Sequence, residues 1–312
     1  MARYSDLRYL GGTEMNIGLV GLGKMGGAIY TRLKSSGFEP QVYDADAKAY
    51  AKIKIPRHRQ RTSLEDLVTS LDKPCYIWIM VPAGPSTTHA IEASGALLSP
   101  GDVIIDGGNS HYKETMHSAA SVVAQSLEFA DVGTSGGVKG ATLGFSMTVG
   151  STPTTYKRIE PILDALADES GYGHLLAGPH GAGHFVKMIH NGIEYGIMEA
   201  YAEGFALLKN SGNFDLDLHQ ISRTWNHGSV VRSWLLELIE DALRDDTSLM
   251  DVNPVVSDSG EGRWTIQEAT DSRTPIPVIA ASLWTRFASQ NLSYSDRLLA
   301  KLRNIFGGHP LH

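Results

Sequence analysis

Short apolar runs recur along the first half of the chain, and each run ends at a glycine, a proline or a polar residue. Such runs are typical of fully buried strands, because strands covered on both faces show no alternation of polar and apolar residues. The expected strands are Asn16–Val20, Gln41–Asp44, Cys75–Val81, Val103–Asp106, Phe129–Val132 and Phe145–Val149. Helical patterns separate most of these runs, beginning with one at about 24–36 that stops at Gly37. The alternation predicts a parallel sheet with helices on both faces, which is an α/β domain.

The hydrophobic pattern changes after about residue 179. From Gly181 to about Asn210, apolar residues recur at helical spacing without any strand signal. Further helical patterns cover about 216–225, 230–243, 277–290 and 293–305. We therefore expect an α/β domain at 15–179 followed by an all-helical domain at 180–312. Residues 1–14 lack the apolar centre of an export signal, and we expect them to be a disordered extension.

Charge and composition narrow the classes of partner. The 312 residues include 27 Lys and Arg against 34 Asp and Glu, so the formal charge is −7. A protein that binds nucleic acid needs surplus positive charge, which argues against such a partner here. Cys75 is the only cysteine, which excludes an internal disulfide and a cysteine metal site and favours a reducing compartment. Since no apolar stretch approaches the roughly 20 residues of a membrane span, we expect a cytoplasmic protein without membrane contacts.

A glycine-rich turn follows the first predicted strand. It consists of Gly21, Leu22, Gly23, Lys24, Met25 and Gly26, in the pattern G-x-G-x-x-G. Between a buried strand and a helix, this pattern is typical of a turn that binds a dinucleotide. The first glycine permits the turn, the second lets the backbone approach the pyrophosphate, and the third allows close packing of helix on strand. A turn without a ligand is the alternative, and the context favours a Rossmann-type dinucleotide-binding domain.

Asp44 ends the second predicted strand, about 18 residues after the last glycine of the turn. A carboxylate in this position accepts hydrogen bonds from the adenosine ribose and repels a 2′-phosphate, so it favours NAD over NADP. An ordinary acid at the end of a strand is the alternative. Nearby, Arg57, Arg59 and Arg61 form a basic cluster that belongs either to a solvated loop or to a phosphate contact.

The segment from Gly181 to Tyr195 contains the richest chemistry in the chain. On a helix, its polar residues share one face: Lys187, His190, Asn191, Glu194 and Tyr195. The adjoining face is apolar: Val186, Ile189, Ile193 and Ile197. A solvated polar face is one interpretation. The segment also contains several glycines, which cost helix stability and so indicate close packing or approach of a ligand.

Several motifs together resemble those of the 6-phosphogluconate dehydrogenases, the decarboxylating enzymes of the pentose phosphate pathway. The motifs are Gly21–Gly26, Asp106–Ser110, Ser135–Gly137, Gly181–Tyr195, Gly262–Thr265 and Arg303–His309. The resemblance runs from about Met15 to the C-terminus. It implies an α/β Rossmann-type domain followed by an all-α domain, in the short form of the family that often uses NAD.

The resemblance also implies roles for individual residues. Lys187 matches the general base that takes the proton of the substrate 3-hydroxyl, and Glu194 matches the general acid that protonates C1 after carbon dioxide leaves. A lysine that begins as a base needs a pKa below its usual ~10.4. The implied substrate contacts are Asn109, Ser135, Gly136, Gly137, His190, Asn191, Tyr195, Arg286, Arg303 and His309. Asn191 is also grouped with the catalytic residues.

The remaining implications concern cofactor and assembly. Besides the glycine turn and Asp44, the expected cofactor contacts are Met80, Val81, Pro82 and Asn109. Arg303 and His309 match a tail that reaches the active site of the other subunit, so we expect a homodimer or homotetramer. A protonated Lys187 can polarise the ketone, and the twelve histidines show no metal-like spacing, so no metal is expected.

Two positions depart from the long form of the family. Ser259 and Glu261 replace a lysine and a threonine that hold the substrate phosphate there. Because a glutamate repels a phosphate dianion, we expect this loop to be rearranged or to point away. Two alternatives therefore stay open: a dehydrogenase for another β-hydroxy acid, and a non-catalytic protein that senses a nucleotide.

Overall fold

The computed structural model describes residues 15–290, 294, 297–298 and 301. Contacts between residues divide the chain into two units, one ending at Met188 and the other beginning at Ile189. The extension expected at 1–14 and most of the helix expected at 293–305 lie outside the described residues. The two units are described in turn.

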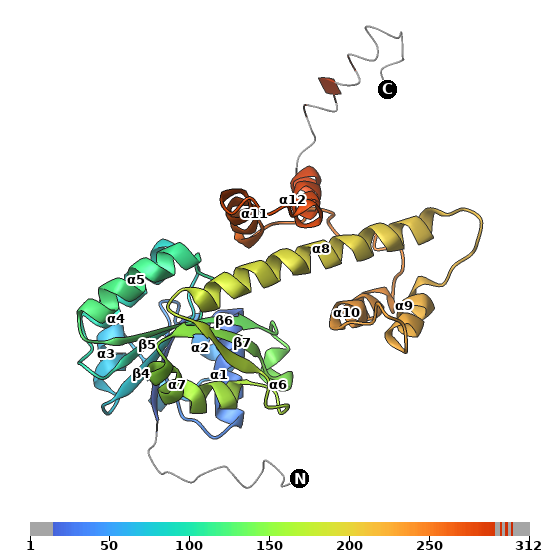
Figure 1. The fold of residues 1–312 in the computed structure, drawn as a ribbon. Helices are drawn as coiled ribbons and strands as arrows, with labels where there is room; N and C mark the ends of the chain where they lie inside the picture. Colours follow the sequence, from blue (N-terminus) through green and yellow to red (C-terminus); the bar gives the residue numbers. More distant parts are fainter. Residues whose placement is uncertain (1–14, 291–293, 295–296, 299–300, 302–312) are drawn as a thin grey trace. The chain divides into compact units, whose positions relative to one another are not determined.

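The first unit contains a sheet whose strands follow the order β3-β2-β1-β4-β5-β6-β7-β8 (Figure 1). The strands are β1 Asn16–Val20, β2 Gln41–Tyr43, β3 Gln60–Arg61, β4 Cys75–Ile79, β5 Val103–Asp106, β6 Glu128–Ser135, β7 Ser146–Ser151 and β8 His174–Gly178. The helices are α1 Lys24–Ser35, α2 Lys48–Ile53, α3 Leu64–Thr69, α4 Pro85–Gly95, α5 Tyr112–Ala124, α6 Gly140–Leu143 and α7 Pro153–Leu166, with a 3₁₀ turn at Arg57–Arg59. The predicted α/β class is confirmed.

The direction of β7 corrects the expected all-parallel sheet. β7 pairs antiparallel with β6, whereas the other strand pairs are parallel. Only ten residues, including the one-turn α6, separate β6 from β7, and a parallel crossover needs a dozen or more. The sequence reasoning missed β3, which has two residues, and β8, which is half exposed at the sheet edge. β3 is too short to contain an apolar run, and the run of three apolar residues in β8 is partly exposed.

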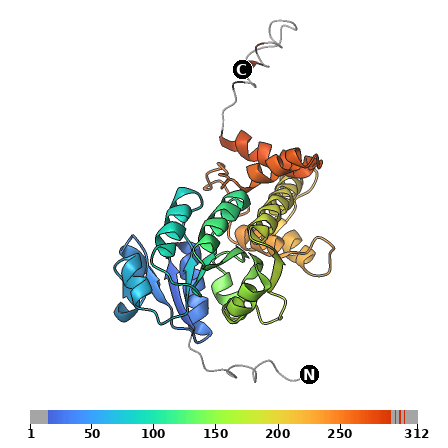
Figure 2. The same ribbon diagram turned by 60° about the vertical axis from the view of Figure 1, so that its left-hand side comes forward.

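Two apolar clusters cover the two faces of the sheet. Alternate residues of β4 show the division, because Trp78 belongs to one cluster and Ile77 and Ile79 belong to the other. The cluster around Trp78 includes residues of α1 and α7, and the opposite cluster includes residues of α3, α4 and α5 (Figure 1 and Figure 2). Cys75 lies in the second cluster, fully buried, and burial raises the pKa of its thiol to about 11. The thiol therefore stays protonated near neutral pH, as expected for an inert cysteine.

The described part of the second unit is helical, as predicted. Its helices are the rest of α8 (Ala182–Asn210, which begins in the first unit), α9 Leu218–Asn226, α10 Trp234–Leu243, α11 Glu261–Asp271 and α12 Pro277–Gln290. α9 packs on α10 and α11 packs on α12. The side chains of Asp217 and Ser233 cap α9 and α10, which moves both starts past the expected residues. Sequence reasoning missed α11, which has Gly260 at its N-cap and Gly262 within its first turn.

Among the described helices, none is both long and apolar enough to cross a membrane.

Candidate active site

The glycine-rich turn joins β1 to α1 at the carboxyl end of the sheet. Gly21 has φ of 93°, and its N–H donates to the carbonyl of Tyr43 at 2.9 Å. α1 has no side-chain cap at its N-terminus. A Cβ on Gly23 would have no atom of the described chain within 4 Å, so the backbone there borders open space. These features suit the close approach of a diphosphate to backbone N–H groups.

Asp44 lies beside this turn. Its Oδ2 accepts the N–H of Leu22 at 2.5 Å, and its Oδ1 accepts the N–H of Asp46 at 2.7 Å. The carboxylate is thus held at the end of β2 next to the glycine turn, as the sequence predicted. Two residues of the basic cluster are engaged elsewhere: Arg59 pairs with the Glu39 carboxylate at 3.1 Å, and Arg61 donates to Gln41 at 2.7 Å.

The cofactor contacts expected directly after β4 lie at the topological switch point of the sheet, where the winding of the strands changes direction. β1 pairs with β2 on one side and β4 on the other, and ligands of such sheets bind where the winding changes direction. Met80 donates its N–H to the carbonyl of Val20 at 2.8 Å, which places Met80, Val81 and Pro82 directly after the strand. The structure thus brings the glycine turn, Asp44 and this segment to one edge of the sheet.

Asp106 at the end of β5 holds the turn that contains Asn109. The carboxylate is buried and accepts the N–H of Gly108 at 3.1 Å and the hydroxyl of Ser110 at 2.8 Å. Gly108 and Ser110 are buried, whereas Asn109 between them is exposed. The turn therefore presents Asn109 outward at the same edge of the sheet.

The next strand, β6, ends at Ser135, followed by Gly136 and Gly137. Both glycines have positive φ, at 131° and 55°. Positive φ is costly for other residues, so the sharp turn after β6 requires glycine here. The turn lies at the carboxyl end of β6, which pairs with β5.

The N-terminal turn of α8 packs against β6 and β7. Asp131 of β6 is fully buried and accepts the N–H groups of Gly181 at 2.6 Å and His184 at 2.9 Å. Burial raises the pKa of Asp131, and the charge of His184 and the two N–H bonds partly oppose this rise. Lys187 follows one turn later and is 8% exposed.

Four of the predicted polar residues lie on the part of α8 in the second unit. Asn191 and Tyr195 are buried, Glu194 is half-buried and His190 is exposed. The His190 ring lies 3.8 Å from the Glu194 carboxylate. The adjoining apolar residues Val186, Ile193 and Ile197 are 39%, 51% and 41% exposed. Burial of Lys187, Asn191 and Tyr195 beside exposed apolar residues contradicts the interpretation of a solvated polar face.

Arg286 of α12 contacts Tyr195. The guanidinium carbon lies 3.4 Å from the centre of the Tyr195 ring, and Nη1 donates to the carbonyl of Ser257 at 3.1 Å. A Cβ on Gly262 would lie 2.8 Å from the Tyr195 ring, so glycine lets α11 approach it closely. Two of the expected substrate contacts are thus brought together in the second unit.

The loop at Ser259 and Glu261, where the sequence departs from the long form of the family, has its own internal contacts. Ser259 donates its hydroxyl to Glu261 at 2.5 Å, and Glu261 is only 3% exposed. Arg263 pairs with Asp258 at 2.6 Å. The Glu261 carboxylate is therefore turned into the protein.

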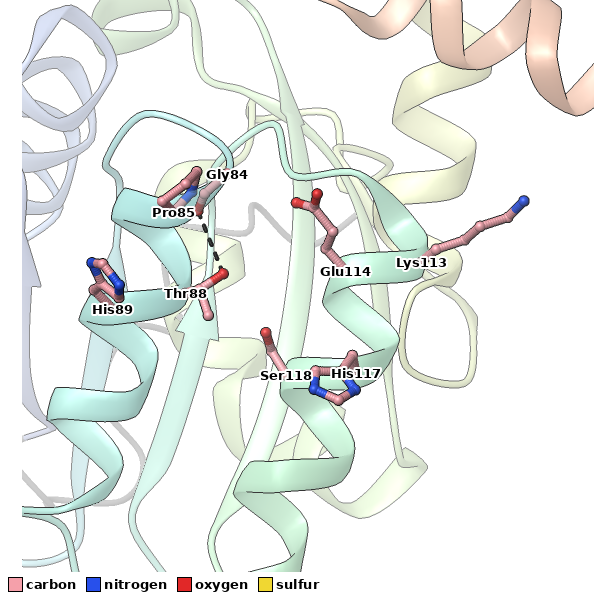
Figure 3. Close-up of a pocket in the computed structure, with 8 residues that line it drawn as sticks. All are labelled: Gly84, Pro85, Thr88, His89, Lys113, Glu114, His117 and Ser118. Carbon is pink, nitrogen blue, oxygen red and sulfur yellow. Dashed lines mark hydrogen bonds between the residues drawn. The ribbon is translucent and has the colours of Figure 1, made fainter.

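A groove of about 560 Å³ lies on the first unit, between α4 and α5 (Figure 3). It is lined by Gly84, Pro85, Thr88, His89, Lys113, Glu114, His117 and Ser118. None of these residues was a predicted site residue. Although the groove contains histidines and a glutamate, the described residues form no group of three side chains that could hold a metal ion.

Arg303 and His309 lie outside the described residues. Sequence reasoning noted Asp106 only as the first residue of a motif, and it missed Asp131. The structure connects Asp106 to the Asn109 turn and Asp131 to the start of α8. A signal was present, because each aspartate interrupts or ends an apolar strand, and a buried carboxylate needs partners.

Comparison with known proteins agrees with this geometry. Residues 16–174 match the NAD binding domain of 6-phosphogluconate dehydrogenase, and residues 183–306 match the C-terminal domain of that enzyme. The chain is 43% identical over 300 residues to the NAD(+)-dependent, decarboxylating 6-phosphogluconate dehydrogenase of Haloferax volcanii, covering 95% of this chain and 98% of the relative. It is 36% identical to an NAD(+)-dependent enzyme of that name from Bacillus subtilis, covering 88% and 61%.

Among solved structures, the Plasmodium falciparum 6-phosphogluconate dehydrogenase superposes with a TM-score of 0.81 at 29% identity. The match covers 94% of this chain and 65% of the Plasmodium chain. The chain therefore belongs to the 6-phosphogluconate dehydrogenase family of oxidoreductases.

Proposed function

We propose that the protein oxidises and decarboxylates 6-phospho-D-gluconate to D-ribulose 5-phosphate and carbon dioxide, with NAD as the oxidant, in the pentose phosphate pathway of the cytoplasm. The observation that supports this most directly is the buried polar stripe of α8, formed by Lys187, Asn191 and Tyr195. Buried lysine is rare without a functional or paired role. The names of the relatives from Haloferax volcanii and Bacillus subtilis support the same reaction.

The residues of α8 supply the acid and base. Lys187 takes the proton of the C3 hydroxyl as the hydride leaves C3. Bound NAD would supply the hydride acceptor. The protonated Lys187 then polarises the new ketone, which stabilises the enediol formed as carbon dioxide leaves. Lys187 gives its proton to the ketone oxygen as the enediol forms, and it takes a hydroxyl proton back when Glu194 protonates C1 of the enediol. This route needs no metal, because the ammonium group replaces a Lewis acid.

The cofactor residues fit a dinucleotide. The N-terminus of α1 lacks a side-chain cap and borders open space at Gly23, which leaves backbone N–H groups for a diphosphate. The fixed carboxylate of Asp44 suits ribose hydroxyls and disfavours a 2′-phosphate. The segment Met80–Pro82 and Asn109 complete the proposed NAD contacts.

The proposed substrate contacts are the residues of the motifs that resemble those of the family. We assign the carboxylate and hydroxyl groups to Asn109, Ser135, Gly136, Gly137, His190, Asn191 and Tyr195, and the phosphate to Arg286, Arg303 and His309. Arg303 and His309 belong to the tail of the neighbouring subunit, so the active protein is a homodimer or homotetramer. The exposed apolar residues of α8 support such an assembly.

A dehydrogenase for an unphosphorylated β-hydroxy acid is the second candidate. It is favoured by the loop at Ser259 and Glu261, because Ser259 bonds to a carboxylate whose charge repels a phosphate dianion. The ion pair between Asp258 and Arg263 also favours this candidate, because the positive charge of Arg263 is already paired with a carboxylate.

One assay separates these candidates. Initial rates are measured at 340 nm with 6-phosphogluconate and with unphosphorylated gluconate, each with NAD and NADP, while carbon dioxide is trapped. We expect NADH and carbon dioxide in equal amounts from 6-phosphogluconate alone. NADH without carbon dioxide, or turnover of gluconate in preference, would replace the proposal with the second candidate. Binding of NAD without turnover of either acid would indicate a sensing protein.

A further inference from the structure

One face of β6 lies beneath the first turns of α8. Asp131, Gly133 and Ser135 alternate along the strand, so their side chains point to the same side of the sheet. The backbones approach closely there, because a Cβ on Gly183 would lie 2.5 Å from the Thr148 carbonyl oxygen and 2.7 Å from that of Asp131. The start of α8 therefore rests on the backbone of the sheet without intervening side chains.

Asp131 fixes this helix at its N-terminus. Its two carboxylate oxygens accept separate N–H groups, those of Gly181 and His184, at 2.6 and 2.9 Å. The first N–H groups of a helix have no partner within the helix, so a buried carboxylate is a strong acceptor for them. Two bonds from one planar group restrict both the position and the rotation of the helix. The His184 ring also bonds Thr115 of α5 at 2.8 Å, which holds the same turn from another element.

Gly133 leaves room for the stem of Lys187. A Cβ added to Gly133 would collide with the Cβ of Lys187 and would lie 2.7 Å from the carbonyl oxygen of Gly183. Lys187 thus lies directly against the strand, one turn beyond the residues that Asp131 holds. Any side chain at 133 would lift the lysine from the sheet.

We propose that Asp131 and Gly133 are positioning residues that set the depth and rotation of the first turns of α8, and thereby the place of the Lys187 amine relative to substrate. The inference rests on the proposed role of Lys187 as the base. Neither residue is proposed to touch substrate or NAD. A misplacement of about 1 Å lowers catalytic rates by as much as a hundredfold, so the effect belongs in kcat.

The test compares two variants with two matched controls. Asp131→Asn keeps the size of the side chain but loses one acceptor, and Gly133→Ala adds the obstructing methyl group. Asp102→Asn is the first control, because Asp102 is also buried and accepts two backbone N–H groups, from Cys75 at 2.9 Å and Ser99 at 2.8 Å, at the opposite edge of the sheet. Gly204→Ala is the second, because Gly204 lies on α8 with open space around it.

We expect Asp131→Asn and Gly133→Ala to lower kcat by roughly 10- to 100-fold. The dissociation constant of NAD should stay within about twofold, and both controls should keep the wild-type kcat. Hydrogen exchange at residues 181–188 should accelerate by about tenfold in Asp131→Asn and not in Asp102→Asn. Wild-type kcat in folded Gly133→Ala, or in folded Asp131→Asn, would overturn the proposal.

These readouts separate the inference from the function on which it rests. If the wild-type protein fails to turn over 6-phosphogluconate, the proposed function is wrong, whereas the exchange measurement still tests the hold of Asp131 on α8. Unchanged exchange at 181–188 would overturn the positioning role whatever the substrate is. If Asp131→Asn does not fold, Gly133→Ala decides, because it removes no hydrogen bond.

Discussion

Lys187 is a buried lysine on a helix whose neighbouring apolar residues are exposed. Burying a lysine and exposing isoleucine both cost free energy, so this reversal indicates a requirement other than stability. The same residue is one turn from the buried carboxylate that holds α8. This arrangement supports the proposed catalytic role of Lys187.

Replacing Lys187 by methionine should abolish turnover while NAD still binds. Methionine has a similar length and suits a buried position, so the fold should persist. Loss of the base and of the cation that polarises the ketone should lower kcat by at least ~10³-fold. The checks are the rate at 340 nm and calorimetric titration with NAD. Turnover near the wild-type rate would remove Lys187 from the mechanism.

Coenzyme preference should depend on the charge of Asp44. In Asp44→Arg the repulsion of a 2′-phosphate becomes attraction, so the ratio of kcat/KM for NAD over NADP should fall by roughly 10-fold or more. Asp44→Asn is the matched control, since its amide oxygen can still accept the N–H of Leu22. It should lose part of the preference without favouring NADP. An unchanged ratio in both variants would exclude Asp44 as the selector.

At the scale of secondary-structure elements, the sequence predicts the strands that contain a run of buried apolar residues. The six expected strands all exist, because each contains enough buried apolar residues to be seen without context. The direction of β7 depends on the short connection after Gly137, and β8 depends on pairing at an edge, so neither is visible in periodicity. α11 begins between two glycines and is stabilised by packing against α12, which local propensity cannot report.

In the candidate site, too, local patterns could be predicted from the sequence and contacts between distant residues could not. That Lys187, Asn191 and Tyr195 share one helix was predicted because their spacing is a local property of the sequence. Contacts between distant residues, such as Asp131 with the start of α8, depend on strand register and were not found. The burial of Glu261 was likewise invisible, although the departure from the family at that position was noted.

Asp102 connects the starts of β4 and β5 and should give a pH-dependent stability. Burial would raise the pKa of Asp102, but bonds from Lys73 and from the N–H groups of Cys75 and Ser99 outweigh it and lower that pKa. A lowered folded-state pKa stabilises the fold above the unfolded value near 3.9, and the gain is lost as pH falls through the folded value.

Asp102→Asn should therefore cost about 1–3 kcal/mol of unfolding free energy at pH 7, and less at pH 3. The measurement is urea unfolding of both proteins at the two pH values. Lys73→Met should cost less at pH 7, because its ammonium is partly exposed. An equal cost of Asp102→Asn at pH 3 and pH 7 would show that the charge of Asp102 contributes nothing.

At the scale of the whole molecule, the exposed apolar stripe of α8 calls for a partner surface. Val186, Ile193 and Ile197 lie on one side of the helix, and contiguous apolar patches on soluble proteins commonly mark interfaces. Other exposed apolar residues of the second unit include Val278 and Trp284 of α12. A second copy of the chain is the partner that the proposed function requires, because it would supply Arg303 and His309.

Mixing two inactive variants tests whether subunits share an active site. In Lys187→Met the base is absent but the tail is intact, and in Arg303→Ala the tail is altered but the base is intact. If each site combines one subunit's base with the other's tail, a mixed dimer has one intact site. Random exchange then yields mixed dimers as half of the total, so activity should recover to about a quarter of the wild-type value. If the tail serves its own subunit, every mixed dimer stays as impaired as its parents and nothing is regained. Sedimentation of the wild-type protein at assay concentration is the control, because complementation requires that the subunits associate.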